Sequence, residues 1–200
     1  ASLCYDLDEV DPQSIVEDTI RNIFDGIQLV DLRKALIMSV RTKIETEPHY
    51  SYLAARLLLE DLHTEALNFL EQPMVSNLEE KNAQYSTIFK AFIHKAVQLE
   101  LLSPVLESFD LDKLGKALEL ERDNQFTYLG LQTLYDRYFL HSDHTRFELP
   151  QVFFMRIAMG LAIEETNKEE RAIEFYNLLS SFDYMSSTPT LFNSGTLRSQ

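Results

Sequence analysis

Apolar side chains recur every three or four residues along most of the chain, from Pro12 to Leu179. This spacing places them on one face of an α-helix, so the pattern predicts a succession of amphipathic helices. The stretch 49–70 is denser in leucine and alanine, and its apolar residues cover more than one face, which predicts a helix buried on two sides. The other helices are expected, in chain order, over 12–26, 31–45, 76–102 (as one or two helices), 110–120, 121–140, 150–162 and 166–179.

Residues with known capping preferences mark several of these helix ends. Asp11 and the proline after it are typical of an N-cap, and Gly26 suits the end of that first helix. The run 110–112 begins a short helix, and Pro150 suits the first position of another. The run 166–170 resembles a capping box, in which a threonine and a glutamate satisfy each other's backbone N–H groups. These signals predict separate helices of ordinary length.

Signals for β-strands are few. Residues 145–149 alternate weakly between polar and apolar side chains, and 182–185 have the composition of one short strand. With so little sheet, we predict an all-α domain over residues 1–180, with at most a minor hairpin near 141–149. Residues 181–200 break the helical pattern and form a separate segment.

The composition excludes several classes of protein. Acidic residues number 32 and basic residues 18, which gives a net charge of −14, and no block rich in lysine or arginine occurs. Such a chain is a poor partner for nucleic acid, because binding phosphates needs basic side chains. It has no apolar run of about 18 residues or more, so no membrane span is expected, and its acidic start lacks the order of a secretion signal. Cys4 is the only cysteine, which fits a reducing cytoplasm.

No complete catalytic or metal site can be found in the sequence. His141 and His144 lie three residues apart around Asp143, but no third strong ligand follows, so we favour a solvated loop over a metal site. The chain lacks a Gly-x-Ser-x-Gly nucleophile elbow and the glycine-rich loops that hold nucleotide phosphates. Adjacent carboxylates, as at 79–80 and 164–165, do not face one another on a helix and are expected at the surface. We therefore assign no catalytic and no metal-binding residue to this chain.

The segment 181–200 carries the strongest chemical signal. Seven serine and threonine hydroxyls lie within fourteen of its residues, and Asn193 to Gly195 has the composition of a turn. Leu191 and Phe192 are apolar, so we expect them to hold the segment against a core. Hydroxyl and backbone N–H groups on a loop can donate to a phosphate oxygen, although an ordinary polar surface loop has the same composition. The residues alone leave both interpretations open.

The string STPTLFNSGT at 187–196 resembles the substrate loop of the large (α) subunit of ribonucleotide reductases. The string HYSYLAARLLL at 49–59 is similar to a helical signature of the same family, and FDGIQLVDLRKALI at 24–37 is similar to the segment before it. Residues 121–139 and 148–162 resemble the family's next two blocks, in the same order. The resemblance covers most of residues 20 to 200.

This resemblance implies where the chain belongs in a larger enzyme. Residues 181–200 would lead into the first strand of a ten-stranded α/β barrel, and the catalytic cysteines and the nucleotide-sensing ATP-cone are expected outside this chain. Thr188, which precedes Pro189, would lie on the phosphate side of the substrate, with help from Thr190. The proline favours an extended conformation at Thr188, which would project the hydroxyl away from the local backbone.

The resemblance also implies partners. The complete enzyme would reduce ribonucleotides to deoxyribonucleotides for DNA synthesis by radical chemistry, as an α homodimer in the cytoplasm. A separate β subunit with iron or manganese would supply the radical, so no cofactor is expected in this chain, and the chain alone would not be catalytic. Two alternatives remain open: the same region of a cobalamin-dependent reductase, and a non-enzymatic, all-helical interaction module.

Overall fold

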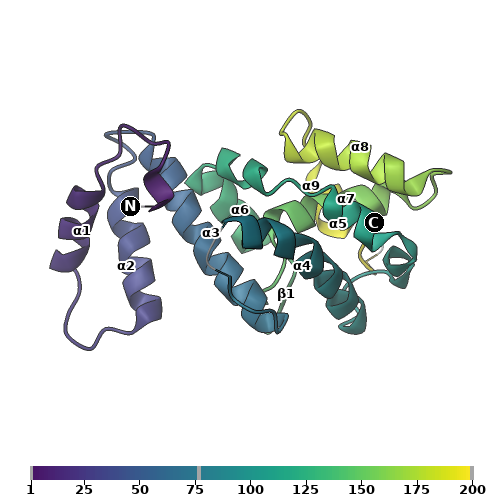
Figure 1. Ribbon diagram of the computed structural model, residues 1–200, viewed down its shortest axis with the longest axis horizontal. Coiled ribbons are helices and arrows are strands. Elements are labelled where there is room, and N and C mark those ends of the chain that lie inside the picture. Colours follow the sequence, from purple (N-terminus) through teal and green to yellow (C-terminus); the bar gives the residue numbers. More distant parts are fainter. Residues whose placement is uncertain (1, 76–77, 199–200) are drawn as a thin grey trace. The chain divides into compact units, whose positions relative to one another are not determined.

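The computed structural model describes residues 2–75 and 78–198 of the 200. Ser76, at the start of one expected helix, and Ser199 and Gln200, at the end of the terminal segment, lie outside the described residues, as does the side chain of Glu79. The described residues form mostly α-helix, which confirms the predicted all-α class (Figure 1).

The helices follow one another with short connections. The α-helices of the described residues are α1 (Pro12–Arg21), α2 (Leu29–Arg41), α3 (Tyr50–Phe69), α4 (Leu78–Gln98), α5 (Leu111–Lys116), α6 (Tyr128–Arg137), α7 (Pro150–Ala162), α8 (Lys168–Ser180) and α9 (Thr188–Asn193). Short 3-10 helices cover Ser2–Cys4, Pro104–Ser108 and Leu120–Gln125. The antiparallel strands β1 (His141–Ser142) and β2 (Thr145–Arg146) pair His141 with Arg146 and form the expected minor hairpin.

Several helix starts follow the capping signals in the sequence. Asp11 is the N-cap of α1, and its carboxylate accepts a hydrogen bond from the Gln13 N–H over 3.0 Å. Asp110 caps α5 in the same way, accepting from the Lys113 N–H over 2.9 Å. Pro150 lies in the first turn of α7. A proline is tolerated there because the first N–H groups of a helix have no partner within it.

Several local predictions about helices and strands were wrong. Helix α1 ends at Arg21, before Gly26, because the Asn22 side chain donates to the carbonyl of Asp18 and caps the last turn. No capping box forms before α8, since the N-cap is Asn167 and has no side-chain hydrogen bond. The expected helix over 121–140 is divided at the buried side chain of Phe126. Residues 182–185 form no strand, because Phe182 has a φ of +63° directly after α8.

The chain divides into two compact units, of which the first contains the residues up to Leu62 together with Asn124–Arg137. Helices α1 and α2 lie side by side in it as an antiparallel pair (Figure 1). The Arg56 guanidinium is buried in this unit and donates to both carboxylate oxygens of Asp6, over 2.6 and 2.9 Å, and to the carbonyl of Leu3. The hydrogen bonds from Arg56 lower the pKa of Asp6. One core cluster of this unit contains Leu7, Val10, Ile15, Val40, Tyr50, Leu53 and Ala54.

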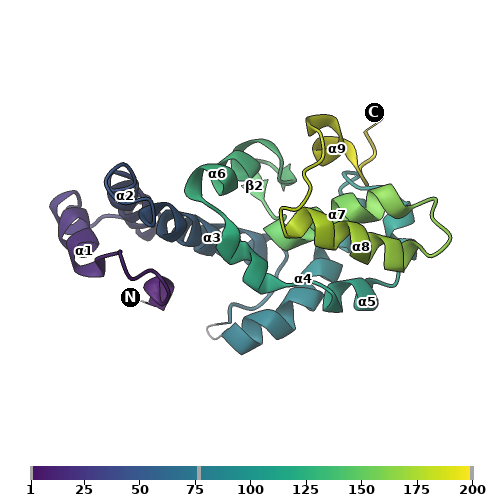
Figure 2. The same ribbon diagram turned by 90° about the horizontal axis from the view of Figure 1, so that it is seen from above.

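The second unit contains His63–Asp123 and Tyr138–Gln200. Helix α7 is its centre: every residue from Pro150 to Met159 is buried, as in a helix that is surrounded on all sides. Helix α8 packs along α7, and α5 packs on α4 (Figure 2). The buried α7 therefore organises the packing of this unit.

A polar cluster lies within the core of the second unit. Gln151 on α7 donates to Asp123 Oδ1 over 2.7 Å and accepts from the Tyr176 hydroxyl over 2.7 Å. Burial raises the pKa of Asp123 to about 7 and raises the pKa of the nearby Tyr85 well above its usual range. The second carboxylate oxygen of Asp123 and the Tyr85 hydroxyl are both buried and have no hydrogen bond within the described part of the chain. The Asp123 side chain thus holds its proton well above the pH at which an exposed aspartate loses it.

A raised pKa in the folded state makes the stability of this unit depend on pH. The folded protein binds the Asp123 proton more tightly than the unfolded chain, whose carboxyl has a pKa near 3.8. We expect the free energy of unfolding to fall as the pH rises from about 4 to 7, by at most about 1.4 kcal/mol per pH unit, and to level off above that. Urea unfolding at pH 5, 6, 7 and 8 measures this slope. Asp123→Asn should remove its share of the slope, and equal slopes for the two proteins would contradict the raised pKa.

Core burial in the first unit predicts the cost of truncating α3. The Leu58 side chain is buried, so Leu58→Ala should lower the free energy of unfolding by about 2–5 kcal/mol. Leu57, the preceding residue, is only half-buried, so Leu57→Ala should cost clearly less. Chemical denaturation of both variants checks this order. Equal losses would show that the buried face of α3 is placed wrongly.

Candidate functional site

The terminal segment is held in the second unit by a buried ion pair. Arg156 on α7 and Glu148, just before α7, have no exposed side-chain surface, and Arg156 Nε donates to Glu148 Oε1 over 2.8 Å. Arg156 Nη1 donates to the carbonyls of Leu191 and Ser194, over 3.2 and 2.9 Å. Glu148 Oε2 also accepts from the Leu140 N–H over 2.8 Å. The guanidinium thus connects the core of the unit to the end of α9.

A close approach of two glycines fixes the turn that follows α9. Gly195 has a φ of +76°, a conformation that glycine adopts without strain. A Cβ atom on Gly160 of α7 would lie 2.2 Å from the backbone nitrogen of Gly195 and 2.3 Å from Ser194 Oγ. Ser194 Oγ instead donates to the Ile157 carbonyl over 2.8 Å. The turn therefore lies directly on the backbone of α7.

Backbone hydrogen bonds hold the residues beyond this turn. The Ser103 N–H donates to the Gly195 carbonyl over 3.0 Å, and the Leu197 N–H donates to the Leu101 carbonyl over 3.3 Å. These bonds form an isolated antiparallel bridge between Leu102 and Thr196. The segment is thus attached through residues 191–197, to α7 and to the chain after α4.

The two predicted substrate-binding residues lie just before these attachments in the chain. Thr188 is exposed and is the first residue of α9, so the expectation of an extended conformation at this position was wrong. The helix tolerates Pro189 because its missing N–H falls in the first turn. Thr190 is half-buried, and its hydroxyl lies 3.3 Å from that of Ser187. Ser187 is the N-cap of α9, so Thr188 does not cap the helix.

Tyr138 contacts this surface, and no pattern in the sequence indicated this contact. Its hydroxyl lies 3.2 Å from Thr188 Oγ1, and its ring stacks on Phe192 with centroids 4.5 Å apart. Leu191 is buried, as expected for an anchor. Phe192 is half-buried, and one side of its ring packs against Tyr138. For Arg156 a signal did exist: it is a lone basic residue in the most apolar helix, where a charge needs a buried partner.

The other candidate residues, the histidines and the adjacent carboxylates, do not form a site within the described part of the chain. Within residues 2–75 and 78–198, no three side chains of His, Cys, Asp or Glu form a group that could hold a metal ion. His141 and His144 lie on the small hairpin, where burial and the charge of Arg146 lower the pKa of His141. Glu164 and Glu165 are exposed, as the sequence indicated. None of the described helices has the length and apolar character needed to cross a membrane.

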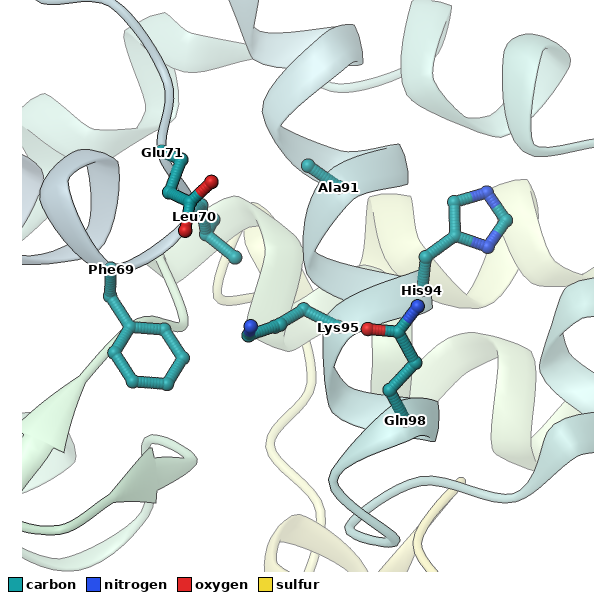
Figure 3. A pocket seen from close by; sticks show the side chains of 7 residues that line it. All are labelled: Phe69, Leu70, Glu71, Ala91, His94, Lys95 and Gln98. Atoms are coloured by element: carbon teal, nitrogen blue, oxygen red, sulfur yellow. The ribbon is translucent and has the colours of Figure 1, made fainter.

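A surface hollow of about 180 Å³ lies between the end of α3 and helix α4 (Figure 3). The Lys95 side chain extends toward the ring of Phe69, at 5.7 Å from its centroid. The His94 ring points to the other side and pairs with Glu107 over 2.7 Å. The hollow contains no residue of the terminal segment, so it is separate from Thr188 and Thr190.

Comparisons with known proteins agree with this architecture. Residues 124–199 match a family model described as the all-alpha domain of ribonucleotide reductase. Over 201 residues, all of this chain, it is 42% identical to a ribonucleoside-diphosphate reductase subunit alpha from Chlamydia trachomatis. It is 35% identical over 196 residues to the corresponding subunit from Helicobacter pylori, and 32% identical over 203 residues to a large subunit from Monkeypox virus. These matches cover 97% and 99% of the chain.

The helical fold and the matched residues together define the all-α region of ribonucleotide reductases. Within that family, the chain is an N-terminal region of the large, or α, subunit. It spans only 19%, 23% and 25% of the length of the three relatives named above.

The contact between the two glycine positions allows a direct test of the attachment. Gly160→Ala places a methyl group against the backbone of Gly195, so we expect a loss of about 1–3 kcal/mol in the free energy of unfolding. The matched control is Gly130→Ala on α6, where the new methyl group meets only an ordinary contact at 3.4 Å. That change should be neutral or slightly stabilising, since alanine favours helix. Equal stability of the two variants in urea unfolding would contradict the close approach at Gly160.

Proposed function

We propose that this chain is the N-terminal part of a ribonucleoside-diphosphate reductase α subunit, and that Thr188 and Thr190 help to bind the phosphates of the ribonucleotide substrate. In the complete enzyme, the 2′-hydroxyl of the substrate is removed to give a deoxyribonucleotide for DNA synthesis. The observation that carries the proposal is the similarity over the full chain to relatives named as α subunits of this enzyme. The diphosphate level of the substrate is taken from their names.

The geometry of the terminal segment supports a binding role for Thr188. Its side chain is exposed, while the end of its short helix, from Leu191 to Gly195, is held by Arg156 and by the turn at Gly195. A hydroxyl on such a fixed backbone can donate to an anionic oxygen with little loss of side-chain freedom on binding. Ser187, not Thr188, occupies the N-cap position of α9, so the Thr188 hydroxyl is not in a capping position.

A threonine hydroxyl orients a phosphate but does not neutralise it. A hydrogen bond to a charged group contributes about 1.5–3 kcal/mol, which is enough to fix a position and too little to hold a diphosphate alone. With a net charge of −14, this chain is not suited to neutralise the phosphates by itself. The proposal therefore assigns positive groups and the catalytic thiols to other parts of the complete subunit.

The proposal extends to partners and location. We propose a separate β subunit with an iron or manganese centre as the source of the radical, an α homodimer, and the cytoplasm as the compartment. No cofactor, metal ligand or catalytic residue is assigned to this chain. Its contribution would be to bind and orient substrate and to present a rigid helical support for the segment that carries Thr188.

The decisive variant is Thr188→Val in the complete α subunit. Valine keeps the shape of threonine and removes the hydroxyl, so the dissociation constant for cytidine diphosphate should rise about ten- to a hundredfold. Isothermal titration calorimetry with cytidine diphosphate measures this change, and thermal unfolding checks that the fold is retained.

A second threonine provides the control. Thr133 lies on α6 in the first unit, and its hydroxyl donates to its own helix, to the Leu129 carbonyl. Thr133→Val removes a hydroxyl without touching the terminal segment and should leave the affinity for cytidine diphosphate unchanged. Unchanged affinity in Thr188→Val would remove Thr188 from the substrate site.

A further inference from the structure

One face of α9 makes two contacts with a single tyrosine. Thr188 and Phe192 are four residues apart in this helix and so lie on the same face. Tyr138 meets both: its hydroxyl is 3.2 Å from Thr188 Oγ1, and its ring stacks on Phe192 at an interplanar angle of 25°. All three residues belong to the second unit.

The direction of the hydrogen bond between these hydroxyls decides what Thr188 can do. A threonine hydroxyl has one proton, and its oxygen can also accept. If Thr188 donates to Tyr138, no proton is left for a phosphate oxygen. If Tyr138 donates to Thr188, the threonine proton is free to bind an anion, and the two hydrogen bonds in series polarise and strengthen each other.

We propose that Tyr138 is a positioning residue for substrate binding, whose hydroxyl donates to Thr188 Oγ1 so that Thr188 can donate to a phosphate oxygen of the ribonucleotide. This inference rests on the proposed role of Thr188. An anionic oxygen accepts and cannot donate, so a bound phosphate selects this direction of the hydrogen bond. The stack with Phe192 holds the tyrosine ring, which fixes the place of its hydroxyl.

A comparison of Tyr138 with its neighbour Phe139 distinguishes a positioning role from a packing role. The next residue, Phe139, is buried and meets Phe153 edge to face with centroids 5.4 Å apart, so it serves the core. Tyr138 is half-buried and directs its hydroxyl to an exposed threonine. Packing against Phe192 would be served equally well by a phenylalanine, so the hydroxyl is the part of Tyr138 that needs a functional explanation.

The test is a double-mutant cycle in the complete α subunit, with cytidine diphosphate as the probe. Tyr138→Phe keeps the ring and removes the hydroxyl, and it should raise the dissociation constant about two- to tenfold while kcat at saturation stays within about twofold of the wild-type value. In the Thr188→Val background, Tyr138→Phe should have no further effect, because the residue through which it acts is gone. Thr188→Ser, which keeps a hydroxyl, should retain both the affinity and the sensitivity to Tyr138→Phe.

The matched control is Tyr184→Phe, at an exposed tyrosine of the same segment, and it should leave binding unchanged. Thermal unfolding of each variant separates a loss of fold from a loss of binding. Full affinity in Tyr138→Phe, with weak binding in Thr188→Val, would overturn the inference and leave the proposed function standing. Effects that add in the double variant would also overturn it, because Tyr138 would then act independently of Thr188. Full affinity in Thr188→Val would instead refute the phosphate-binding role of Thr188, and the inference with it.

Discussion

The buried pair of Arg156 and Glu148 is the interaction on which the second unit depends. Two charges without exposed surface are stable only if every donor and acceptor is satisfied, since the cost of removing an ion from water is large. The pair meets this condition only with the carbonyls of Leu191 and Ser194 in place. The buried guanidinium therefore needs the carbonyls of the terminal segment as acceptors. This need holds the segment in place more firmly than the apolar contact of Leu191 alone.

Two glycines, together with the buried ion pair, hold the terminal turn against α7. Gly160 lets the backbone of the turn reach α7, and Gly195 allows the positive φ that the turn needs. The residues between α8 and the turn can expose hydroxyl groups, as Ser187 and Thr188 do, because the turn already attaches this part of the chain to α7. A site of this kind combines a rigid backbone with an exposed, polar surface, which suits recognition of a charged ligand.

Local patterns in the sequence predicted most of the fold. Helical periodicity indicated the all-α class, and the caps at Asp11 and Asp110 placed the starts of α1 and α5 correctly, because these signals depend on neighbouring residues alone. One error arose because a distant residue takes part. Glu169, expected in a capping box, accepts instead from the Asp110 N–H, 59 residues away. The terminal segment could be singled out because its string resembles a known family, and its role in a site stays a prediction. The contact of Tyr138 with Thr188 joins residues 50 apart and leaves no local pattern.

The link between Arg156 and the Ser194 carbonyl has a consequence for protein synthesis. The ribosome delivers α7 well before the residues of the terminal turn, so for a time two donors of the guanidinium lack their final acceptors. Until then the Arg156 guanidinium on α7 lacks the carbonyls of Leu191 and Ser194, and water must take their place as acceptor. The nascent unit can close only when the turn arrives. The ordered surface around Thr188 therefore forms together with the end of the core, and not before it.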